Sequence, residues 1–309
     1  MDEFVRFVDA PTPIESAPRL AKAIGLLGSD LLVKRDDLIG LGGGGNKVRK
    51  LQYSCGAAVR AGATTLVTAG APQSNHARLT AAAGAGLGLN VILVLAGEAP
   101  ETRRGNLLLD ELFGARIVWS GNRAVDAQAQ TVMNSLAGSG TNAYRIPFGG
   151  SSPSTARGYA DAAHELLQQV PDLDQVVVAV GSGATMAGLV SVLGAERVIG
   201  IETGAVEDAR RTVSGLVNGM SGVSPVRAGM LRLDAGQIGA GYAHLTPAAR
   251  RAMETAARLE GLVLDPTYTG RAMAGLIAAA AGGAIRPGQR TVFLHTGGMP
   301  GLFGHPQVG

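Results

Sequence analysis

The chain has 309 residues, of which 46% are hydrophobic and 17% charged, enough apolar material for one large domain or for two lobes. Its formal net charge is only +3 and its basic residues are scattered, so we expect no nucleic-acid partner. The single cysteine, Cys55, cannot form an internal disulfide, and the first residues lack the pattern of a secretory signal. The apolar stretches are interrupted before membrane length, so we expect a cytoplasmic protein without membrane contact.

Short β-rich runs recur along the chain, and most are apolar throughout rather than alternating. They cover residues 64–69, 91–96, 116–119, 175–180, 198–202 and 291–295. Continuous apolar runs separated by helical patterns are typical of parallel strands that are covered on both faces. The predicted fold class is therefore α/β, with parallel sheets flanked by helices. The segment 218–241 is the least regular and is expected to lie over the surface.

A glycine-rich turn leads into an amphipathic helix at Lys47. Apolar residues follow at helical spacing, namely Val48, Leu51, Cys55 and Val59. Lys47 and Lys50 lie three residues apart, so they share a face of this helix. One lysine there can form an imine with an aldehyde while the other reaches a phosphate, and a nearby cation and helix N-terminus lower the pKa of the imine-forming lysine. A solvated basic helix start is the alternative interpretation.

The motif Gln73-Ser74-Asn75-His76 precedes a helical pattern over residues 77–88. Ser and Asn are ordinary helix caps, which is the simpler interpretation. In the functional interpretation, the free N–H groups at this helix start bind a carboxylate, and Ser74 Oγ takes part in proton transfer. His76 is expected to lie just outside that substrate site. The other histidines do not stand with cysteines or acids at metal-ligand spacing, so we predict no catalytic metal.

The turn Gly181-Ser182-Gly183-Ala184-Thr185 follows the strand pattern 175–180 and opens a helical pattern over 186–193. Backbone N–H groups at such a turn, with Ser and Thr hydroxyls, form a cradle for an anion. The turn lacks the lysine ending of a P-loop and the glycine spacing of a dinucleotide fingerprint, which favours a monophosphate. Tight packing of a strand on a helix also calls for glycine and is the alternative.

Two polar turns come last, Asp265-Pro266-Thr267-Tyr268-Thr269-Gly270 and His295-Thr296-Gly297-Gly298. Tyr268 and Tyr242 are two of only five tyrosines, and either alone is compatible with core packing. Since Tyr268 stands before a helix-opening glycine, it can instead offer its phenol to a site. The carboxyl ends of parallel strands gather at one edge of a sheet, so the glycine and polar turns together predict one functional site.

The segments GGNKVRK, QSNHAR, GSGAT, DPTYTGRAMAGL and HTGG, in this order, resemble the D-cysteine desulfhydrase and 1-aminocyclopropane-1-carboxylate deaminase family over nearly the whole chain. The resemblance implies the tryptophan-synthase-β-like fold, called fold type II among pyridoxal 5′-phosphate enzymes. It implies a larger cofactor-binding lobe of residues 1–50 and 145–309, a smaller lobe of residues 51–144, and a homodimer. Closure of the lobes about Gly149 and Gly150 is a further hypothesis.

The resemblance also implies roles for the cofactor residues. Lys47 would hold pyridoxal 5′-phosphate covalently, Asn75 would hydrogen-bond its phenolic oxygen, and Thr296 would face its pyridine nitrogen. Lys50 and the turn Gly181–Thr185 would hold the phosphate. Ala184 departs from relatives, which often carry glycine or a polar residue there, and the chain is shorter than usual around residues 194–207.

On the substrate side, the resemblance places the substrate carboxylate at Ser74, Asn75 and His76, with Tyr242 and Tyr268 as catalytic residues of the pocket. The implied activity is β-elimination from a small amino acid, with D-cysteine as the best candidate. The alternatives are a 1-aminocyclopropane-1-carboxylate deaminase, an L-cysteate sulfo-lyase, a transferase such as a cysteine synthase, and a non-catalytic phosphate-ligand-binding protein. The deaminase branch carries a glutamate where this chain has Thr269, so hydroxyls at Thr269 and Thr296 favour elimination over ring opening.

Overall fold

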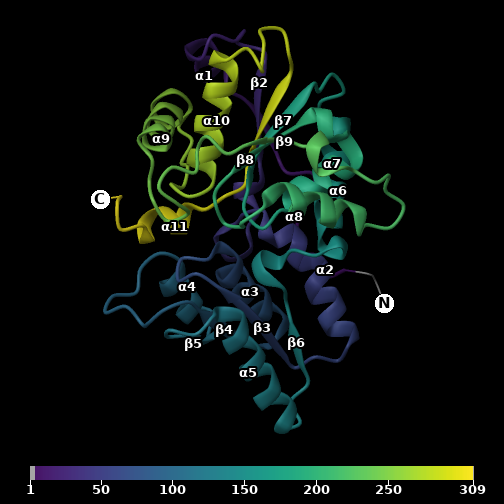
Figure 1. The fold of residues 1–309 in the computed structure, drawn as a ribbon, viewed down its shortest axis with the longest axis vertical. Helices are drawn as coiled ribbons and strands as arrows, with labels where there is room; N and C mark the ends of the chain where they lie inside the picture. The colour runs from purple at the N-terminus through teal and green to yellow at the C-terminus, as the bar shows by residue number, and fades with distance from the viewer. Residues whose placement is uncertain (1–3, 309) are drawn as a thin grey trace.

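The computed structural model describes residues 4–308 and contains two β-sheets, one in each of two stacked lobes (Figure 1). The six-stranded sheet has the order β1 (Ile14–Ser16), β2 (Leu31–Arg35), β10 (Thr291–His295), β7 (Gln175–Val180), β8 (Val198–Glu202) and β9 (Arg232–Asp234). The four-stranded sheet has the order β5 (Arg116–Trp119), β4 (Asn90–Leu95), β3 (Thr65–Gly70) and β6 (Ala143–Arg145). All neighbouring strands are parallel except β1 and β2.

Helices cover both faces of the six-stranded sheet, as continuous apolar strands require. One face packs against α1 (Pro18–Ala23), α9 (Pro247–Glu260) and α10 (Thr269–Ala281). The other face packs against α6 (Pro153–Gln169), α7 (Ala184–Leu193) and α8 (Ala209–Asn218). The short helix α11 (Met299–Gly304) follows β10 and contacts the small lobe at α4.

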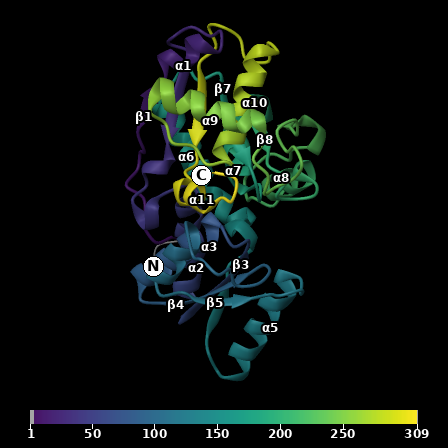
Figure 2. The same ribbon diagram turned by 90° about the vertical axis from the view of Figure 1, so that its left-hand side faces the viewer.

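Helices also cover both faces of the four-stranded sheet. Its inner face packs against α2 (Lys47–Arg60), α3 (Asn75–Leu87) and α4 (Asn106–Leu112), and its outer face against α5 (Val125–Gly138). Figure 2 shows α5 on the far side of this sheet from the large lobe, with α2 and α3 between the sheet and that lobe. The helices that begin with Lys47 and Asn75 therefore lie at the junction of the lobes.

Single-turn 3₁₀ helices complete the described chain at Asp36–Leu38, Leu41–Gly43, Phe148–Gly150, Ala195–Arg197 and Ala228–Met230. No helix within residues 4–308 is long and apolar enough to cross a membrane. The predicted lobe bounds stay a proposal, supported by the small sheet, which begins at Thr65 and ends at Arg145.

The α/β class is confirmed, and four of the six predicted strands have the observed bounds, the other two being displaced by one residue. Strands β1, β2, β6 and β9 were not predicted from the sequence. Three of these have only three residues, and β2 ends in two charged residues whose side chains are paired in the fold. The segment 218–241 is not wholly irregular, because β9 within it pairs with β8. Val59, predicted on the apolar face of α2, is 41% exposed.

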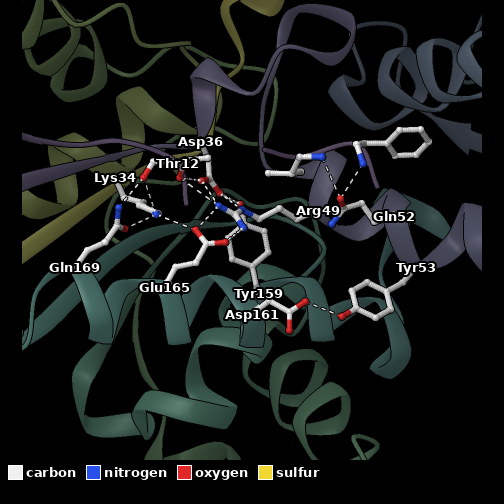
Figure 3. A network of polar contacts seen from close by, with 12 residues as sticks. Thr12, Lys34, Asp36, Arg49, Gln52, Tyr53, Tyr159, Asp161, Glu165 and Gln169 are labelled. Atoms are coloured by element: carbon white, nitrogen blue, oxygen red, sulfur yellow. Dashed lines mark hydrogen bonds and ion pairs between the residues drawn. The ribbon is translucent and has the colours of Figure 1, made fainter. Parts of the chain in front are cut away.

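A buried ionic network fixes α2 against the large lobe (Figure 3). Arg49, two residues after Lys47, donates to both oxygens of Asp36 at 2.9 and 3.0 Å and to both oxygens of Glu165 on α6. Tyr159 Oη donates to Asp36 Oδ2 at 2.5 Å, and Lys34 of β2 donates to Glu165. Since each charged group of this network is paired, α2 is anchored next to its first residue to α6 and to the turn that follows β2.

Candidate active site

Two adjoining cavities lie at the carboxyl ends of strands from both sheets, as the turns predicted. A narrow cavity is lined by Asn46, Lys47, Asn75, Ala179, Gly181, Ser182, Gly183, Thr185, Met186, Tyr268, Thr296 and Gly297. A cavity of about 280 Å³ is lined by Lys47, Gly70, Ala71, Ser74, His76, Ala96, Val125, Phe148, Gly149, Ser182, Gly204, Ala205, Tyr242 and Tyr268. We call them the narrow cavity and the wide cavity. Lys47, Ser182 and Tyr268 line both.

Lys47 is the first residue of α2 and is only 9% exposed. Burial lowers the pKa of its amine to about 8, against an opposing hydrogen bond with Lys50. The lowered pKa confirms the predicted direction, but burial is the leading cause rather than a neighbouring cation. A larger neutral fraction makes this amine a better nucleophile for an aldehyde.

Lys50 is buried and lines neither cavity. Its Nζ donates to Gly149 O at 2.6 Å and to Ser151 Oγ at 3.1 Å, and Ser151 Oγ lies 2.7 Å from Ser182 Oγ. Burial first, and the charge of Lys47 second, lower its pKa. The structure thus joins Lys50 to the anion turn through Ser151, and its direct contact with a phosphate stays a prediction.

The turn Gly181–Thr185 lies at the N-terminus of α7. Gly183 precedes the helix with φ +91°, a conformation that favours glycine, and no side chain caps the helix. The N–H groups of the first turn are therefore available to an anion, and Ser182 and Thr185 add hydroxyls. The side chain of Ala184 is buried in the core and can contribute only its backbone.

Ser74 caps α3, because its Oγ accepts from Ala77 N at 3.2 Å. The interpretation of Ser74 as a helix cap is therefore correct. Ser74 also lines the wide cavity, which leaves the functional interpretation standing. Strand β3 approaches it closely, since a Cβ on Gly70 would lie 2.8 Å from Ser74 Oγ. The free N–H groups of this helix start favour a carboxylate.

His76 is a buried neutral histidine that also lines the wide cavity. Thr68 Oγ1 donates to Ile146 O at 3.0 Å, so at 2.9 Å it accepts from His76 Nε2. Within the described chain Nδ1 has no hydrogen-bond partner, although it is buried. Burial, with the charges of Lys47 and Lys50, lowers the His76 pKa well below its usual value.

Tyr242 and Tyr268 are brought together at the wide cavity, where their hydroxyls are hydrogen-bonded to each other. Burial raises the pKa of both phenols, so both are protonated at neutral pH. Thr296 lines the narrow cavity. Thr269 lines neither cavity, because its hydroxyl donates to Asp265 Oδ1 at 2.7 Å.

Several residues of the site were not singled out from the sequence. Asn46 stands beside Lys47 and donates to Thr185 Oγ1 at 2.9 Å, so its position in the glycine-rich motif was the available signal. Phe148, Ala96 and Val125 form apolar parts of the wide cavity, and only tertiary structure brings them to it. Within residues 4–308, no three His, Cys, Asp or Glu side chains gather as a metal site would require.

A two-lobed α/β fold with a buried lysine next to an uncapped helix N-terminus defines a class of enzymes that hold a phosphate-bearing aldehyde on lysine. The donor set, namely the free α7 N-terminus, Ser182, Thr185 and the low-pKa amine of Lys47, fits pyridoxal 5′-phosphate. The chain belongs to the pyridoxal-phosphate dependent enzyme family, whose sequence pattern matches residues 5–297. The cofactor and the enzyme class are therefore confirmed, against the non-catalytic alternative.

Individual relatives agree with this assignment. The chain is 40% identical to a protein of Pyrococcus abyssi provisionally named a 1-aminocyclopropane-1-carboxylate deaminase, over 94% of this chain and 90% of that protein. It is 39% identical to a D-cysteine desulfhydrase of Salmonella typhimurium, over 98% and 97% of the two chains. A crystal structure of an ACC deaminase homologue superposes with a TM-score of 0.88 at 36% identity, covering 97% of this chain and 93% of the other. The predicted resemblance and fold type are confirmed.

Proposed function

We propose that this enzyme is a lyase that eliminates a β-substituent from a small amino acid, and that D-cysteine is its substrate, with pyruvate, sulfide and ammonia as products. Relatives carry the names of both a desulfhydrase and a deaminase, so the choice has to rest on the site. One observation carries it: none of the residues lining the two cavities, all within the described chain, has a carboxylate.

Three positions near the narrow cavity support this proposal. Thr269 stands where the deaminase branch carries glutamate, and Thr296 offers only a hydroxyl. Asp265 is buried, and its oxygens already accept from the N–H groups of Thr267, Tyr268 and Thr269 at 2.8–2.9 Å. A carboxylate beside a pyridine nitrogen would stabilise its protonated form, which a hydroxyl cannot do to the same degree.

When bound, pyridoxal phosphate supplies an electron sink for charge that develops at the substrate Cα, and an unprotonated ring is the weaker sink. A weak sink suffices when a good leaving group departs quickly from Cβ, as sulfide does. It serves less well for opening a cyclopropane ring. The hydroxyl at Thr296 therefore favours elimination.

The chain's own groups have distinct tasks in this reaction. Lys47 Nζ, once the substrate amine has replaced it, takes the proton from Cα, and its lowered pKa suits this role. Ser74 and the N-terminus of α3 bind the substrate carboxylate. The Tyr242–Tyr268 hydrogen bond uses one phenolic proton, and the other phenolic proton remains for a hydrogen bond to the substrate in the wide cavity, which both residues line.

The wide cavity also argues against L-cysteate as the substrate. Among the residues that line this cavity, only Lys47 can carry a positive charge at neutral pH, because His76 is neutral. Ala96, Val125 and Phe148 are apolar. A sulfonate placed there would have no cation of its own, which is costly for a buried charge. A small neutral thiol meets no such cost.

A substrate panel tests the proposal. D-cysteine, L-cysteine, L-cysteate, β-chloro-D-alanine and 1-aminocyclopropane-1-carboxylate are offered in turn, and pyruvate, sulfide, sulfite and 2-oxobutanoate are measured. D-cysteine should release equal amounts of pyruvate and sulfide. Rapid 2-oxobutanoate release from the cyclopropane substrate, without pyruvate from the others, would contradict it. If sulfide is added to the assay and the enzyme then makes cysteine from a β-substituted substrate, the enzyme is a transferase and not a lyase.

We further propose that the enzyme is a cytoplasmic homodimer. Leu112 of α4 and Phe303 of α11 are each 70% exposed on helices that contact one another, and exposed apolar surface of this kind is typical of subunit contacts. Sedimentation equilibrium should give twice the chain mass of 31.3 kDa, and a monomer at micromolar concentration would rule the dimer out.

A further inference from the structure

A buried guanidinium lies behind the narrow cavity and contacts three parts of the site. Arg78 of α3 is fully buried. Its Nη1 donates to Gly42 O at 2.5 Å and to Gly44 O at 3.0 Å in the loop that precedes Lys47. Its Nε donates to Asn106 Oδ1 at 3.1 Å, and its Nη2 lies 3.5 Å from Asn75 Oδ1. One side chain thus joins the glycine loop, α4 and the first residue of α3.

The donor and acceptor roles in this cluster follow from chemistry. A guanidinium can only donate hydrogen bonds, so the Asn106 atom beside Arg78 Nε is the oxygen. The other end of the Asn106 amide is therefore Nδ2, which donates to the carbonyl of Gln73 at 3.0 Å and to Asn75 at 2.9 Å. Since both Asn106 Nδ2 and Arg78 Nη2 are donors, the Asn75 atom that faces them has to be Oδ1.

The remaining end of the Asn75 amide is Nδ2, and Asn75 lines the narrow cavity together with Lys47 and Thr296. Within the described chain, Nδ2 makes no hydrogen bond to another residue. Rotating the amide by 180° would place its two N–H groups against two other donors. The cavity therefore receives N–H donors from Asn75, which suit an oxygen that carries negative charge.

Two other groups support the cluster without competing for its hydrogen bonds. Asp110 lies on α4, and its charge offsets the burial that lowers the Arg78 pKa to about 10. Burial raises the Asp110 pKa to about 7, so at neutral pH this carboxyl balances the guanidinium only in part. Neither of its oxygens has a hydrogen-bond partner within residues 4–308, so it takes none of the Arg78 N–H groups. Gly301 of α11 covers the two amides, because a Cβ there would lie 3.6 Å from Asn106 Nδ2 and 3.8 Å from Asn75 Oδ1.

We propose that Arg78 and Asn106 are positioning residues that hold the Asn75 amide with its N–H groups toward an oxygen of the bound cofactor. The inference deepens the proposed function, since it assumes that pyridoxal 5′-phosphate occupies the narrow cavity, but it does not depend on which amino acid is the substrate. The proposal means that the narrow cavity binds a hydrogen-bond acceptor, and not a donor, opposite the Asn75 amide.

The variant Asn106→Asp tests the proposal. A carboxylate keeps the bond from Arg78 but cannot donate, so the Asn75 amide should turn and present Oδ1 to the cavity. We expect the Kd for pyridoxal 5′-phosphate to rise about 10- to 100-fold and the visible band of the bound cofactor to shift. In an Asn75→Ala background, where no amide is left to turn, Asn106→Asp should change the Kd little, because contributions that act through one residue are not additive.

Asn142→Asp is the matched control, since Asn142 Nδ2 also donates two hydrogen bonds, in this case to the backbone carbonyls of Ala61 and Gly62 outside the site. It should leave the Kd and the visible band unchanged. Asn106→Ser removes the amide donor without adding charge and serves if Asn106→Asp does not fold. An unchanged Kd and band in Asn106→Ser, or an equal rise in Kd with and without Asn75, would overturn the proposal. Since no substrate is added, a negative D-cysteine assay does not affect this outcome.

Discussion

At the scale of single residues, Lys47 and Lys50 have different environments although they share a helix face. Lys47 lines both cavities, whereas Lys50 donates to Gly149 O and Ser151 Oγ. We expect Lys47→Ala to abolish turnover and covalent cofactor attachment, and Lys50→Ala to weaken cofactor binding by about 1.5–3 kcal/mol through loss of a charged contact. Borohydride reduction followed by mass spectrometry measures the attachment. Full activity and reducible cofactor in Lys47→Ala would disprove the assignment.

The pKa of Lys47 predicts how cofactor capture depends on pH. Burial lowers this pKa to about 8, and only the neutral amine attacks an aldehyde. The protonated fraction grows as pH falls, so the rate of capture by cofactor-free protein should drop about tenfold per pH unit below the pKa and level off above it. Stopped-flow absorbance at pH 6–10 measures this rate. A rate that keeps rising to pH 10 would show that the pKa is not lowered.

Ser74 combines a structural and a functional role, and one variant separates them. Ser74→Ala removes the cap on Ala77 N, which costs about 0.5–2 kcal/mol of stability. If Ser74 also moves a proton, turnover should fall about 10²- to 10⁴-fold while the cofactor stays bound. Thermal unfolding and kcat/KM are measured on the same sample. Lower stability with unchanged kcat/KM would leave Ser74 as a helix cap alone.

At the scale of elements, the ionic network around Arg49 holds the first turn of α2 against the large lobe (Figure 3). Burial is the largest single influence on the pKa of Asp36 and raises it, but the charge and hydrogen bonds of Arg49, together with hydrogen bonds from Tyr159 and Thr12, bring this pKa below its usual value. Asp36 is therefore ionised in the fold, and its contribution to stability is present above the ordinary aspartate pKa and is lost as pH falls through the lowered one.

Asp36→Ala should lower the free energy of unfolding by about 3–5 kcal/mol, because it leaves the Arg49 charge buried with one partner fewer. The control is Glu15→Ala, which breaks an ion pair with Arg35 in which Glu15 is exposed and should cost about 0–1 kcal/mol. Urea unfolding at pH 7 compares the two. Equal losses would mean that the network does not anchor α2.

At the scale of the whole molecule, the site lies between two lobes, so its shape depends on how they meet. The connection at Gly149 and Gly150 has φ of +60° and +63°, and Cβ atoms there would lie 2.2 Å from Ser182 Oγ and 2.9 Å from His76 Cε1. Only glycine allows this close approach at the point where the chain returns to the large lobe.

We expect the lobes to close over a bound substrate about this connection, which would exclude water from the reacting Cα. Crystal structures with and without a slowly reacting substrate analogue provide the measurement. The angle between the two sheets should decrease in the complex. If the angle is unchanged, the lobes do not close, and the substrate reaches the site through smaller movements of the cavity wall.

The class of fold and the chemistry of the turns can be predicted from the amino-acid sequence. Short apolar runs between helical patterns are typical of parallel strands, and the runs at 116–119, 175–180, 198–202 and 291–295 are the strands observed. The four glycines that precede Asn46 and Lys47, and Gly183 directly before a helix, set the local backbone conformation at these turns. These features depend on near neighbours in the chain, so a sequence can reveal them.

The residues that lie beside these turns could not be predicted, because the fold brings them there from distant parts of the chain. The edge strands β1, β6 and β9 are too short to have a pattern, and the charged Lys34 of β2 has its partner Glu165 on α6, 131 positions away. Asn106 reaches Asn75 from α4, and Thr269 turns to Asp265 and away from the cavities. Hydrogen-bond direction and charge pairing depend on partners distant in sequence, and folding alone brings those partners together.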